Sequence, residues 1–378
     1  MIKNIITLSI AATVAATSLL PNTADACTRM LWNTNNDFVI VGRNEDYFSA
    51  SAPTLVKTPH GVSRKGSNES NTPTISWTVK YGSVVAYANN RFPMDGMNEK
   101  GLTARTLYFN EGDIDQHAAT DTSKPVLQAD HWVSYILDNF SNIEDAVNAL
   151  KQLRLTAIHG GYSYVESPKH LSMADASGDS AIIEIQNGEL KIFHGKQYTV
   201  MTNPPNIQTQ MEDAHNRAID ANDGSFPSTW GAEDRFQKAQ YWLNNMPNIK
   251  PSDGMNAAYG FMYSALGTTA FVPGIPLPEE DKAVGEKILK HTKPEDSYGV
   301  ATYLQSISDL TNRHYRFKSL LAPADVYLDL NSMDWSAQQK VAVIPRIDRY
   351  AQQGLQGNIA EAFTPINEPD IYQQNVIN

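Results

Sequence analysis

The single cysteine of this 378-residue chain, Cys27, is the residue whose type and position most directly suggest chemistry. It follows Ala24-Asp25-Ala26, and small residues at alternate positions are typical of a leader cleavage site. Cleavage before Cys27 would free an α-amino group with a pKa of roughly 7.7–8.0 beside a thiol with a pKa of roughly 8.5. The amine could then accept the thiol proton, directly or through one water, so one residue would supply both nucleophile and base.

Residues 1–26 have the layout of a secretory signal peptide, with a lysine near the start, an apolar run over 5–20 and a polar end. As a helix the apolar run would span about 24 Å, which is short for a bilayer core of roughly 30 Å. No second apolar run of spanning length follows. We therefore expect cleavage to leave residues 27–378 as one domain that is periplasmic or secreted and has no membrane span.

Two other interpretations of Cys27 remain open. A cysteine can follow a leader by chance, or it can carry the acyl chains of a lipoprotein. Lipoprotein signals normally place a larger aliphatic residue three positions before the cysteine, where this chain has Ala24. On the lipoprotein hypothesis the protein would be a lipid-anchored periplasmic binding protein, and the charged residues clustered further along the chain would be structural.

The composition favours a small-molecule substrate. A formal net charge of −11 argues against a nucleic-acid partner or an anionic membrane surface. One cysteine cannot form an internal disulfide, so the fold must rest on packing.

The chain has no glycine-rich phosphate loop, no G-x-S-x-G elbow and no H-E-x-x-H motif, and its nine histidines are scattered. Residues 220–224 resemble part of a calcium loop but read better as a turn. We expect no metal and no cofactor.

The pattern of apolar residues predicts strands around Cys27. Runs at 30–32 and 38–41, separated by a turn at 33–37, predict a β-hairpin. Its second strand continues into Gly42-Arg43-Asn44-Glu45-Asp46-Tyr47, which would place a cation and two carboxylates level with the start of the mature chain. Further strands are predicted at 75–88 and 101–109, with a turn at 95–101.

The rest of the chain predicts a layered α+β fold. Helices are predicted at 128–139, 143–153 with Ser141 as N-cap, 232–245 and 253–266. An antiparallel meander is predicted from strands at 162–166, 171–174, 181–185, 190–193 and 198–202. Three more strands are predicted at 300–308, 315–321 and 326–328. Residues 206–230 and 273–295 are expected to be surface excursions, and the tail is polar. No β-α-β alternation is present, which favours antiparallel sheets.

Several segments together resemble the choloylglycine hydrolase family of N-terminal-nucleophile hydrolases, which includes penicillin V acylases and bile salt hydrolases. They are Cys27-Thr28-Arg29, Gly42-Arg43-Asn44-Glu45-Asp46-Tyr47, Asp95-Gly96-Met97-Asn98-Glu99-Lys100-Gly101-Leu102, Val200-Met201-Thr202-Asn203-Pro204, Asp234-Arg235-Phe236 and Asp309-Leu310-Thr311-Asn312-Arg313. The resemblance implies a four-layer αββα sandwich and hydrolysis of a linear, non-peptide amide bond. It also implies a homo-oligomer, commonly a tetramer.

The resemblance, matched by position, implies roles for the residues near the chain start. Cys27 would be the nucleophile and, through its amine, the base. Asp46 would hold the α-ammonium group and orient it toward the scissile nitrogen. Arg43 would favour the thiolate through its charge. Plain structural alternatives are a turn cap for Asp46 and an ion pair with a neighbouring carboxylate for Arg43.

Three later residues complete the implied site. The side-chain amide of Asn203 and the backbone N–H of Tyr108 would hold the oxyanion, and losing one such donor commonly costs about 2.7–4 kcal/mol. Arg235 would support the charged centre. The structural alternatives are a turn asparagine ahead of Pro204-Pro205 and a solvated helix arginine.

The same resemblance suggests the substrate. A tyrosine at position 108 is more similar to the penicillin V acylase branch, with its side chain facing the substrate. The short segment between Asn203 and Arg235 resembles Gram-negative members, which act on penicillin V and on long-chain acyl-homoserine lactones, and this shortness weakens the expectation of a tetramer. Apolar pocket candidates are Met30, Tyr47, Phe48 and Tyr108. The expected partner is a small-molecule N-acyl amide, with bile-salt hydrolysis as the alternative.

Overall fold

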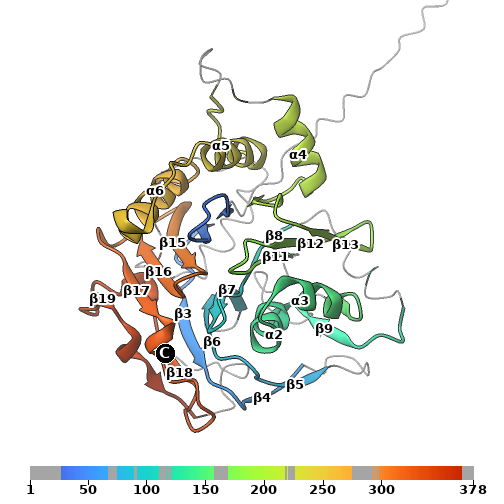
Figure 1. The fold of residues 1–378 in the computed structure, drawn as a ribbon, viewed down its shortest axis with the longest axis vertical. Coiled ribbons are helices and arrows are strands. Elements are labelled where there is room, and N and C mark those ends of the chain that lie inside the picture. Colours follow the sequence, from blue (N-terminus) through green and yellow to red (C-terminus); the bar gives the residue numbers. More distant parts are fainter. Residues whose placement is uncertain are drawn as a thin grey trace, which may run out of the picture.

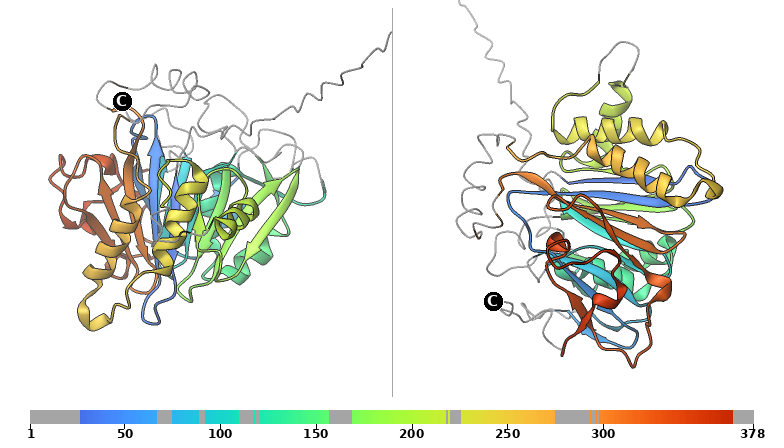
Figure 2. Two further views of the ribbon diagram at one scale, coloured as in Figure 1. Left: turned by 90° about the horizontal axis from the view of Figure 1, so that it is seen from above. Right: turned by 90° about the vertical axis from the view of Figure 1, so that its left-hand side faces the viewer.

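Two large β-sheets lie face to face in the computed structural model, with helices on both outer sides (Figure 1). The structure describes residues 27–66, 75–88, 92–109, 117, 121–156, 169–217, 219, 226–274, 293, 296 and 298–367. The right-hand view of Figure 2 shows helices above one sheet and the second sheet beneath it. The predicted α+β fold, an αββα sandwich, is therefore confirmed.

The seven-stranded sheet contains the predicted hairpin. Its order is β14 (Val200–Met201), β1 (Thr28–Trp32), β2 (Ile40–Tyr47), β15 (Ala301–Asp309), β16 (His314–Ser319), β17 (Val326–Asp329) and β19 (Gly357–Asn358). All neighbours are antiparallel except β17 and β19. The pairing of β1 with β2 confirms the hairpin, and β15 lies against the other side of β2.

The nine-stranded sheet is antiparallel throughout. Its order is β13 (Glu189–His194), β12 (Ser180–Gln186), β11 (Lys169–Ala174), β8 (Thr103–Tyr108), β7 (Phe92–Asn98), β6 (Ser83–Ala88), β3 (Thr54–Thr58), β18 (Ala342–Ile344) and β20 (Thr364–Pro365). Two small sheets pair β4 (Ser63–Lys65) with β5 (Ser76–Thr78), and β9 (Val126–Gln128) with β10 (Arg154–Thr156).

Helices cover the outer face of each sheet. Helices α5 (Ala232–Asn244) and α6 (Met255–Gly267) pack on the seven-stranded sheet, and α4 (Ile207–Asn216) packs against α5. Helices α2 (Trp132–Asn139) and α3 (Ile143–Leu150) pack on the nine-stranded sheet. One face of α3, formed by Ile143, Ala146, Val147 and Leu150, is buried. Short 3-10 helices are η1 (Ala129–His131), η2 (Pro251–Asp253), η4 (Leu330–Ser332), η5 (Ile347–Arg349) and η6 (Ala360–Ala362).

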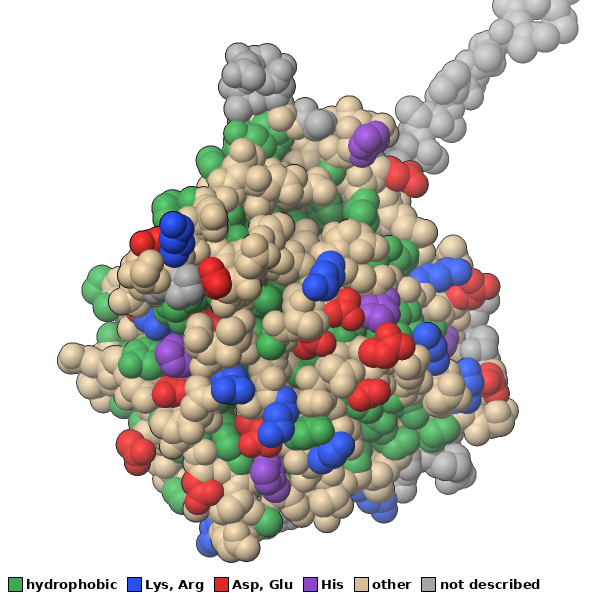
Figure 3. Space-filling model, in the orientation of Figure 1, with side chains coloured by type: hydrophobic (Ala, Val, Ile, Leu, Met, Phe, Trp, Pro, Cys, Tyr) green, Lys and Arg blue, Asp and Glu red, His purple; other side chains and the backbone are tan. Residues whose placement is uncertain are grey.

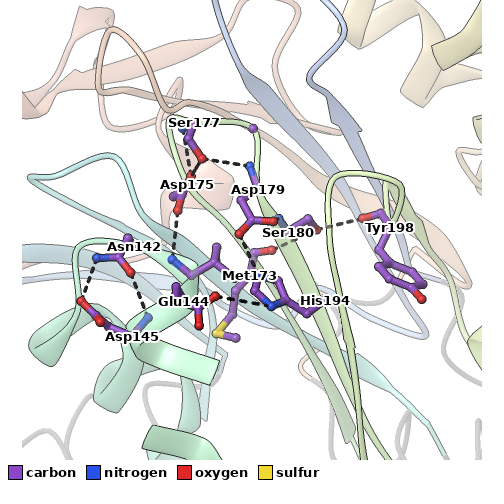
Figure 4. A network of polar contacts seen from close by, with 12 residues as sticks. Asn142, Glu144, Asp145, Met173, Asp175, Ser177, Asp179, Ser180, His194 and Tyr198 are labelled. Atoms are coloured by element: carbon purple, nitrogen blue, oxygen red, sulfur yellow. Dashed lines mark hydrogen bonds and ion pairs between the residues drawn. The ribbon is translucent and has the colours of Figure 1, made fainter. Parts of the chain in front are cut away.

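Helix α3 begins at Ile143 as predicted, but its N-cap lies one residue later than predicted. Asn142, not Ser141, is the N-cap, because its extended backbone lets its side chain accept a hydrogen bond from the Asp145 N–H. The Asp175 carboxylate accepts the N–H of Ile143, also in the first turn (Figure 4). These two acceptors satisfy donors that every helix start leaves open, and they fasten α3 to the β11–β12 hairpin.

Five other predictions were wrong in detail. Residues 206–230 are not irregular throughout, because α4 forms there. The expected turn at 95–101 belongs largely to β7, and the expected strand at 75–88 is divided into β5 and β6. The polar tail contributes β18 and β20 beside β3. The last strand of the expected meander, β14, joins the other sheet. The strand expected at 162–166 and the turn at 220–224 lie outside the described residues, as does most of 273–295.

The surface in Figure 3 carries interspersed acidic and basic side chains. In the described part of the chain, no helix is long and apolar enough to cross a membrane.

Gly42 lets α6 approach β2 closely. A Cβ atom on Gly42 would lie 2.7 Å from Met262 Sδ and 3.0 Å from Leu266 Cδ1. We expect Gly42→Val to lower the free energy of unfolding by about 1–3 kcal/mol through overpacking, measured by urea denaturation. Gly260 on α6 is the control, because no described atom lies within 4 Å of its Cβ position, and Gly260→Ala should be neutral or stabilising. Equal stability of the Gly42→Val variant and the parent would contradict this packing argument.

Candidate active site

Cys27 lies immediately before β1 and is buried within an apolar cluster that includes Met30 and Leu107. Thr28 is opposite Asn44 in the β1–β2 register, and one further step sets Cys27 opposite Glu45. The predicted segment of charged residues on β2 is thus level with the start of β1.

Arg43 places a cation beside the thiol. Its Nη2 atom lies 3.9 Å from Cys27 Sγ and 3.4 Å from the carbonyl oxygen of Thr106. Its Nη1 atom lies 4.0 Å from the carboxylate of Asp95 on the facing sheet. A buried cation at this distance favours a thiolate over a neutral thiol.

Asp46 is a fully buried carboxyl group at the same end of β2. Burial raises its pKa to about 7, although the Arg235 charge, a Thr302 hydrogen bond and the Arg43 charge act in the opposite direction. The Thr302 hydroxyl donates to Oδ1, while no described group hydrogen-bonds Oδ2. The backbone oxygen of Asp46 lies 4.0 Å from Cys27 Sγ. Oδ2 therefore has no hydrogen-bond donor among the described residues, on a residue whose backbone oxygen is near the thiol.

A β-bulge brings Thr302 to Asp46. The register of β15 against β2 shifts between Thr302 and Leu304, so Thr302 is opposite Asp46 and Leu304 is opposite Glu45. The intervening residue is extra in the strand, which re-aims neighbouring side chains. Sequence reasoning placed a strand here but had no local signal for the bulge.

Arg235 joins Cys27 to Asn203 from helix α5. Its Nη1 atom donates to the Cys27 carbonyl oxygen at 2.6 Å and to Thr28 Oγ1 at 2.9 Å. Its Nη2 atom donates to Asn203 Oδ1 at 3.0 Å, and its Nε atom donates to the Trp230 carbonyl at 2.9 Å. The guanidinium is fully buried, so this arginine is a structural tie and not a solvated helix residue.

The contact with Arg235 also orients the Asn203 amide. With Oδ1 turned to the guanidinium, Nδ2 turns away and donates to the backbone oxygen of Tyr108 at 3.1 Å. An amide nitrogen carries two hydrogens, so one remains for another acceptor. The geometry can therefore present an N–H donor to an oxyanion.

The four pocket candidates occupy different environments. Met30 shares the apolar cluster of Cys27. Tyr47 and Phe48 belong to another cluster, and their rings pack edge to face with their centroids 5.6 Å apart. On β8 it is Leu107 that joins the Cys27 cluster, and the Tyr108 ring lies 5.8 Å from the Lys169 ammonium. The assignment of these residues to an acyl pocket stays a prediction.

Residues 27–285 match the family described as linear amide C–N hydrolases, choloylglycine hydrolase family. The chain belongs to the choloylglycine hydrolase family. Its match begins at Cys27, the residue around which the buried charges and amides gather.

Relatives of this chain include penicillin V acylases. The chain is 31% identical over 361 residues to the penicillin V acylase of Pectobacterium atrosepticum, covering 89% of this chain and 90% of the relative. The structure of penicillin V acylase from Agrobacterium tumefaciens is similar, with a TM-score of 0.71 at 28% identity over 90% of this chain and 98% of that one. The predicted family and the predicted linear-amide hydrolase activity are confirmed.

A mutant conjugated bile acid hydrolase from Clostridium perfringens shares the fold. Its TM-score is 0.64 at 19% identity, over 84% of this chain and 96% of that one. The individual roles of the site residues stay predictions.

Several buried polar groups close to the site were not predicted from the sequence. Ser51 donates to Glu45, whose pKa is raised by burial, and Asp95 pairs with Arg105 at 3.1 Å. Glu45 and Asp95 border a small cavity in which the centre of a water molecule could move within about 10 Å³. The cavity is lined by Arg43, Glu45, Ala86, Asp95, Leu304, Ser306 and Phe317. This is room for one water. Among the described residues, no group of three or more His, Cys, Asp or Glu side chains is arranged to hold a metal.

The Thr302 hydroxyl provides a way to test whether ionised Asp46 is required for activity. We expect Thr302→Val to raise the Asp46 pKa relative to that of the parent, because the hydrogen bond favours the ionised carboxylate. If ionised Asp46 is required, the acid limb of kcat/KM should move to higher pH by about one unit, as judged from the strength of hydrogen bonds to charged groups. A pH profile of amide hydrolysis measures the shift.

Thr268→Val is the matched control, because the Thr268 hydroxyl donates to the Ala265 carbonyl at the end of α6, at 2.7 Å. Its pH profile should coincide with that of the parent. An acid limb that does not move in Thr302→Val would contradict a role for ionised Asp46.

Proposed function

We propose that this protein is an exported cysteine amidohydrolase with penicillin V acylase activity. Removal of residues 1–26 would make Cys27 the N-terminal nucleophile. The observation that carries the proposal is the set of groups around Cys27. The Arg43 cation lies 3.9 Å from the thiol, the Asp46 backbone oxygen lies 4.0 Å from it, and Asp46 Oδ2 has no described hydrogen-bond donor. The match of the family from residue 27 onward supports the same first residue.

The proposed reaction uses these groups in two steps. The Cys27 α-amine takes the thiol proton, and the thiolate attacks the amide carbonyl while Arg43 stabilises the negative sulfur. Asn203 and the Tyr108 N–H hold the oxyanion. The tetrahedral intermediate collapses to a thioester as the amine leaves with a proton from the Cys27 ammonium. Water then attacks the thioester, with the α-amine as base, and releases the carboxylic acid and the thiol.

Asp46 has a distinct part in this scheme. Its open carboxylate oxygen would accept a hydrogen bond from the α-ammonium and orient the remaining N–H toward the leaving nitrogen. A buried carboxylate is suited to this, since it interacts strongly with a nearby ammonium in a medium that excludes water.

Penicillin V is the substrate that the relatives favour. The penicillin V acylases are 28–31% identical over about nine-tenths of the chain. The bile salt hydrolase of Clostridium perfringens is 28% identical over only 47% of this chain, and the conjugated bile acid hydrolase of Lactobacillus gasseri is 25% identical over 66% of it. Acyl-homoserine lactones present the same linear amide and are a second substrate to test, and conjugated bile salts are the alternative. Export to the periplasm and assembly into a homo-oligomer belong to the same proposal.

The first test is the N-terminus. We expect the intact mass of the exported protein to correspond to residues 27–378, and one iodoacetamide adduct on Cys27 to abolish penicillin V hydrolysis. Cys27→Ala should be inactive, and Cys27→Ser should lose at least about a hundredfold in kcat/KM, because a hydroxyl ionises far less readily than a thiol. Mass spectrometry and an assay of the released amine measure these outcomes.

Other results of that test would reject the mechanism. Full activity of Cys27→Ser would show that the thiol is not the nucleophile. A retained leader or an acyl chain on the Cys27 amine would leave no free base, and membrane partitioning of such a species would favour the lipid-anchored alternative.

The second test is the oxyanion donor. We expect Asn203→Ala to lower kcat by about 10²–10³ with little change in KM, because the donor acts mainly on the charge that develops in the transition state. Steady-state kinetics with penicillin V measures both constants. Asn245→Ala, at the exposed end of α5, is the control and should behave like the parent. A rise in KM at constant kcat would instead assign Asn203 to ground-state binding.

A further inference from the structure

The turn that carries Asn203 has few hydrogen-bond donors of its own. It runs from the end of β14 through Pro204 and Pro205 to α4. Proline has no backbone N–H, so two consecutive residues cannot donate a turn-closing hydrogen bond. The carbonyl groups of this buried segment therefore need donors from elsewhere.

Gln210 supplies those donors from the second turn of α4. Its Nε2 atom donates to the Asn203 carbonyl oxygen at 2.6 Å and also to the Pro205 carbonyl oxygen. Its Oε1 atom accepts from Thr202 Oγ1 at 2.5 Å. Both N–H groups and the carbonyl of the Gln210 amide are thus in use, and its side chain is only 2% exposed. The Gln210 amide therefore hydrogen-bonds Asn203 itself and one residue on each side of it.

Helix α4 is itself held in place. The Ile207 N–H lies 3.2 Å from each carboxylate oxygen of Glu184, and the Asn206 side chain caps the helix by accepting the Thr209 N–H. Glu184 is also 3.1 Å from His170 Nδ1 on the adjacent strand. The helix that carries Gln210 is therefore anchored to the nine-stranded sheet at its first turn.

The Asn203 residue is consequently restrained at two points. Arg235 and the Tyr108 carbonyl hold its side chain, and Gln210 holds its main chain. We propose that Gln210 is a positioning residue that fixes the backbone of Asn203 so that its amide meets the oxyanion. This inference rests on the proposed function of Asn203. It gives α4 a part in catalysis although Gln210 does not touch the substrate.

The size of the expected effect follows from geometry. A hydrogen-bond donor acts on an oxyanion only within about 2.7–3.1 Å, and displacement by about 1 Å can cost about a hundredfold in rate. Loss of Gln210 should let the Asn203 backbone move without removing its amide. The loss in kcat should therefore be smaller than that of Asn203→Ala.

The experiment compares Gln210→Met, which keeps length and volume but has no amide, with Gln208→Met, an exposed residue on the same helix. We expect Gln210→Met to lower kcat for penicillin V by roughly 10–100-fold with KM within about twofold. The rate of Cys27 alkylation by iodoacetamide should not change, because alkylation forms no oxyanion. Gln208→Met should match the parent in all three quantities.

Thr202→Val provides a second, milder variant. It removes the hydroxyl that donates to Gln210 Oε1 and that also lies 3.1 Å from the Ala232 carbonyl oxygen. The Gln210 amide keeps its two donors to the turn, so we expect a smaller loss of kcat. In the double variant the Thr202 change should add little to that of Gln210→Met, because both act through one amide. If Gln210→Met folds poorly, Thr202→Val alone tests the inference, since it must still lower kcat while the amount of alkylatable Cys27 is unchanged.

Three results would overturn the inference. They are an unchanged kcat in Gln210→Met, a Thr202→Val variant whose loss of activity is absent or fully accounted for by loss of alkylatable Cys27, and a full additional loss in the double variant. Failure of the proposed function is a separate observation, seen as absence of hydrolysis by the parent protein. It would remove the basis of the inference as well.

Discussion

The buried guanidinium of Arg235 ties together parts of the chain that are far apart in sequence. It binds the carbonyl of Cys27, the hydroxyl of Thr28 and the side chain of Asn203. A guanidinium removed from water must have its donors satisfied, or the cost is several kcal/mol. The partners of Arg235 therefore cannot move independently. Helix α5, the start of β1 and the turn after β14 form one unit because of this group.

The carboxyl groups of the site reduce the stability of the fold. The shift of the Asp46 pKa from 3.8 to about 7 means that its surroundings favour the neutral form by about 4 kcal/mol. The folded state then holds this proton more tightly than the unfolded chain does, so the contribution of Asp46 to stability falls as the pH rises from about 4 to 7. An ionised carboxyl at this position thus lowers stability at neutral pH, which agrees with the catalytic role proposed for Asp46.

The parts of the site that could be predicted from sequence are those that local patterns specify. Cys27 and the segment around Arg43 and Asp46 lie on one hairpin, whose apolar runs and turn are visible in the chain. Asn203 and Arg235 were reached only through resemblance, since nothing local distinguishes them from a turn asparagine and a helix arginine. Thr302 and Gln210 were missed for a physical reason. The contact of Thr302 with Asp46 joins residues 256 positions apart and depends on a bulge, and α4 was obscured by its polar sequence.

The uneven success of the fold prediction has the same origin. The apolar residues of α3 mark a single helix face, so the sequence alone predicts this helix. The position of its N-cap depends on the backbone angles at Asn142. The three-residue strand β18 is held by its pairing with β3 and β20 in the nine-stranded sheet. Short strands in a polar tail have no periodicity of their own, because tertiary pairing and not local preference creates them.

The open oxygen of Asp46 gives a physical reason for coupling leader removal to activity in the proposed scheme. While residue 26 is attached, the nitrogen of Cys27 is a neutral amide and the carboxyl group has burial as its main influence. Cleavage would convert that nitrogen into an amine that can carry a positive charge. An ammonium beside a buried carboxyl lowers the pKa of the acid, and the two groups then titrate as a pair. The same cut would thus create the base, charge Asp46 and supply the partner that its second oxygen lacks.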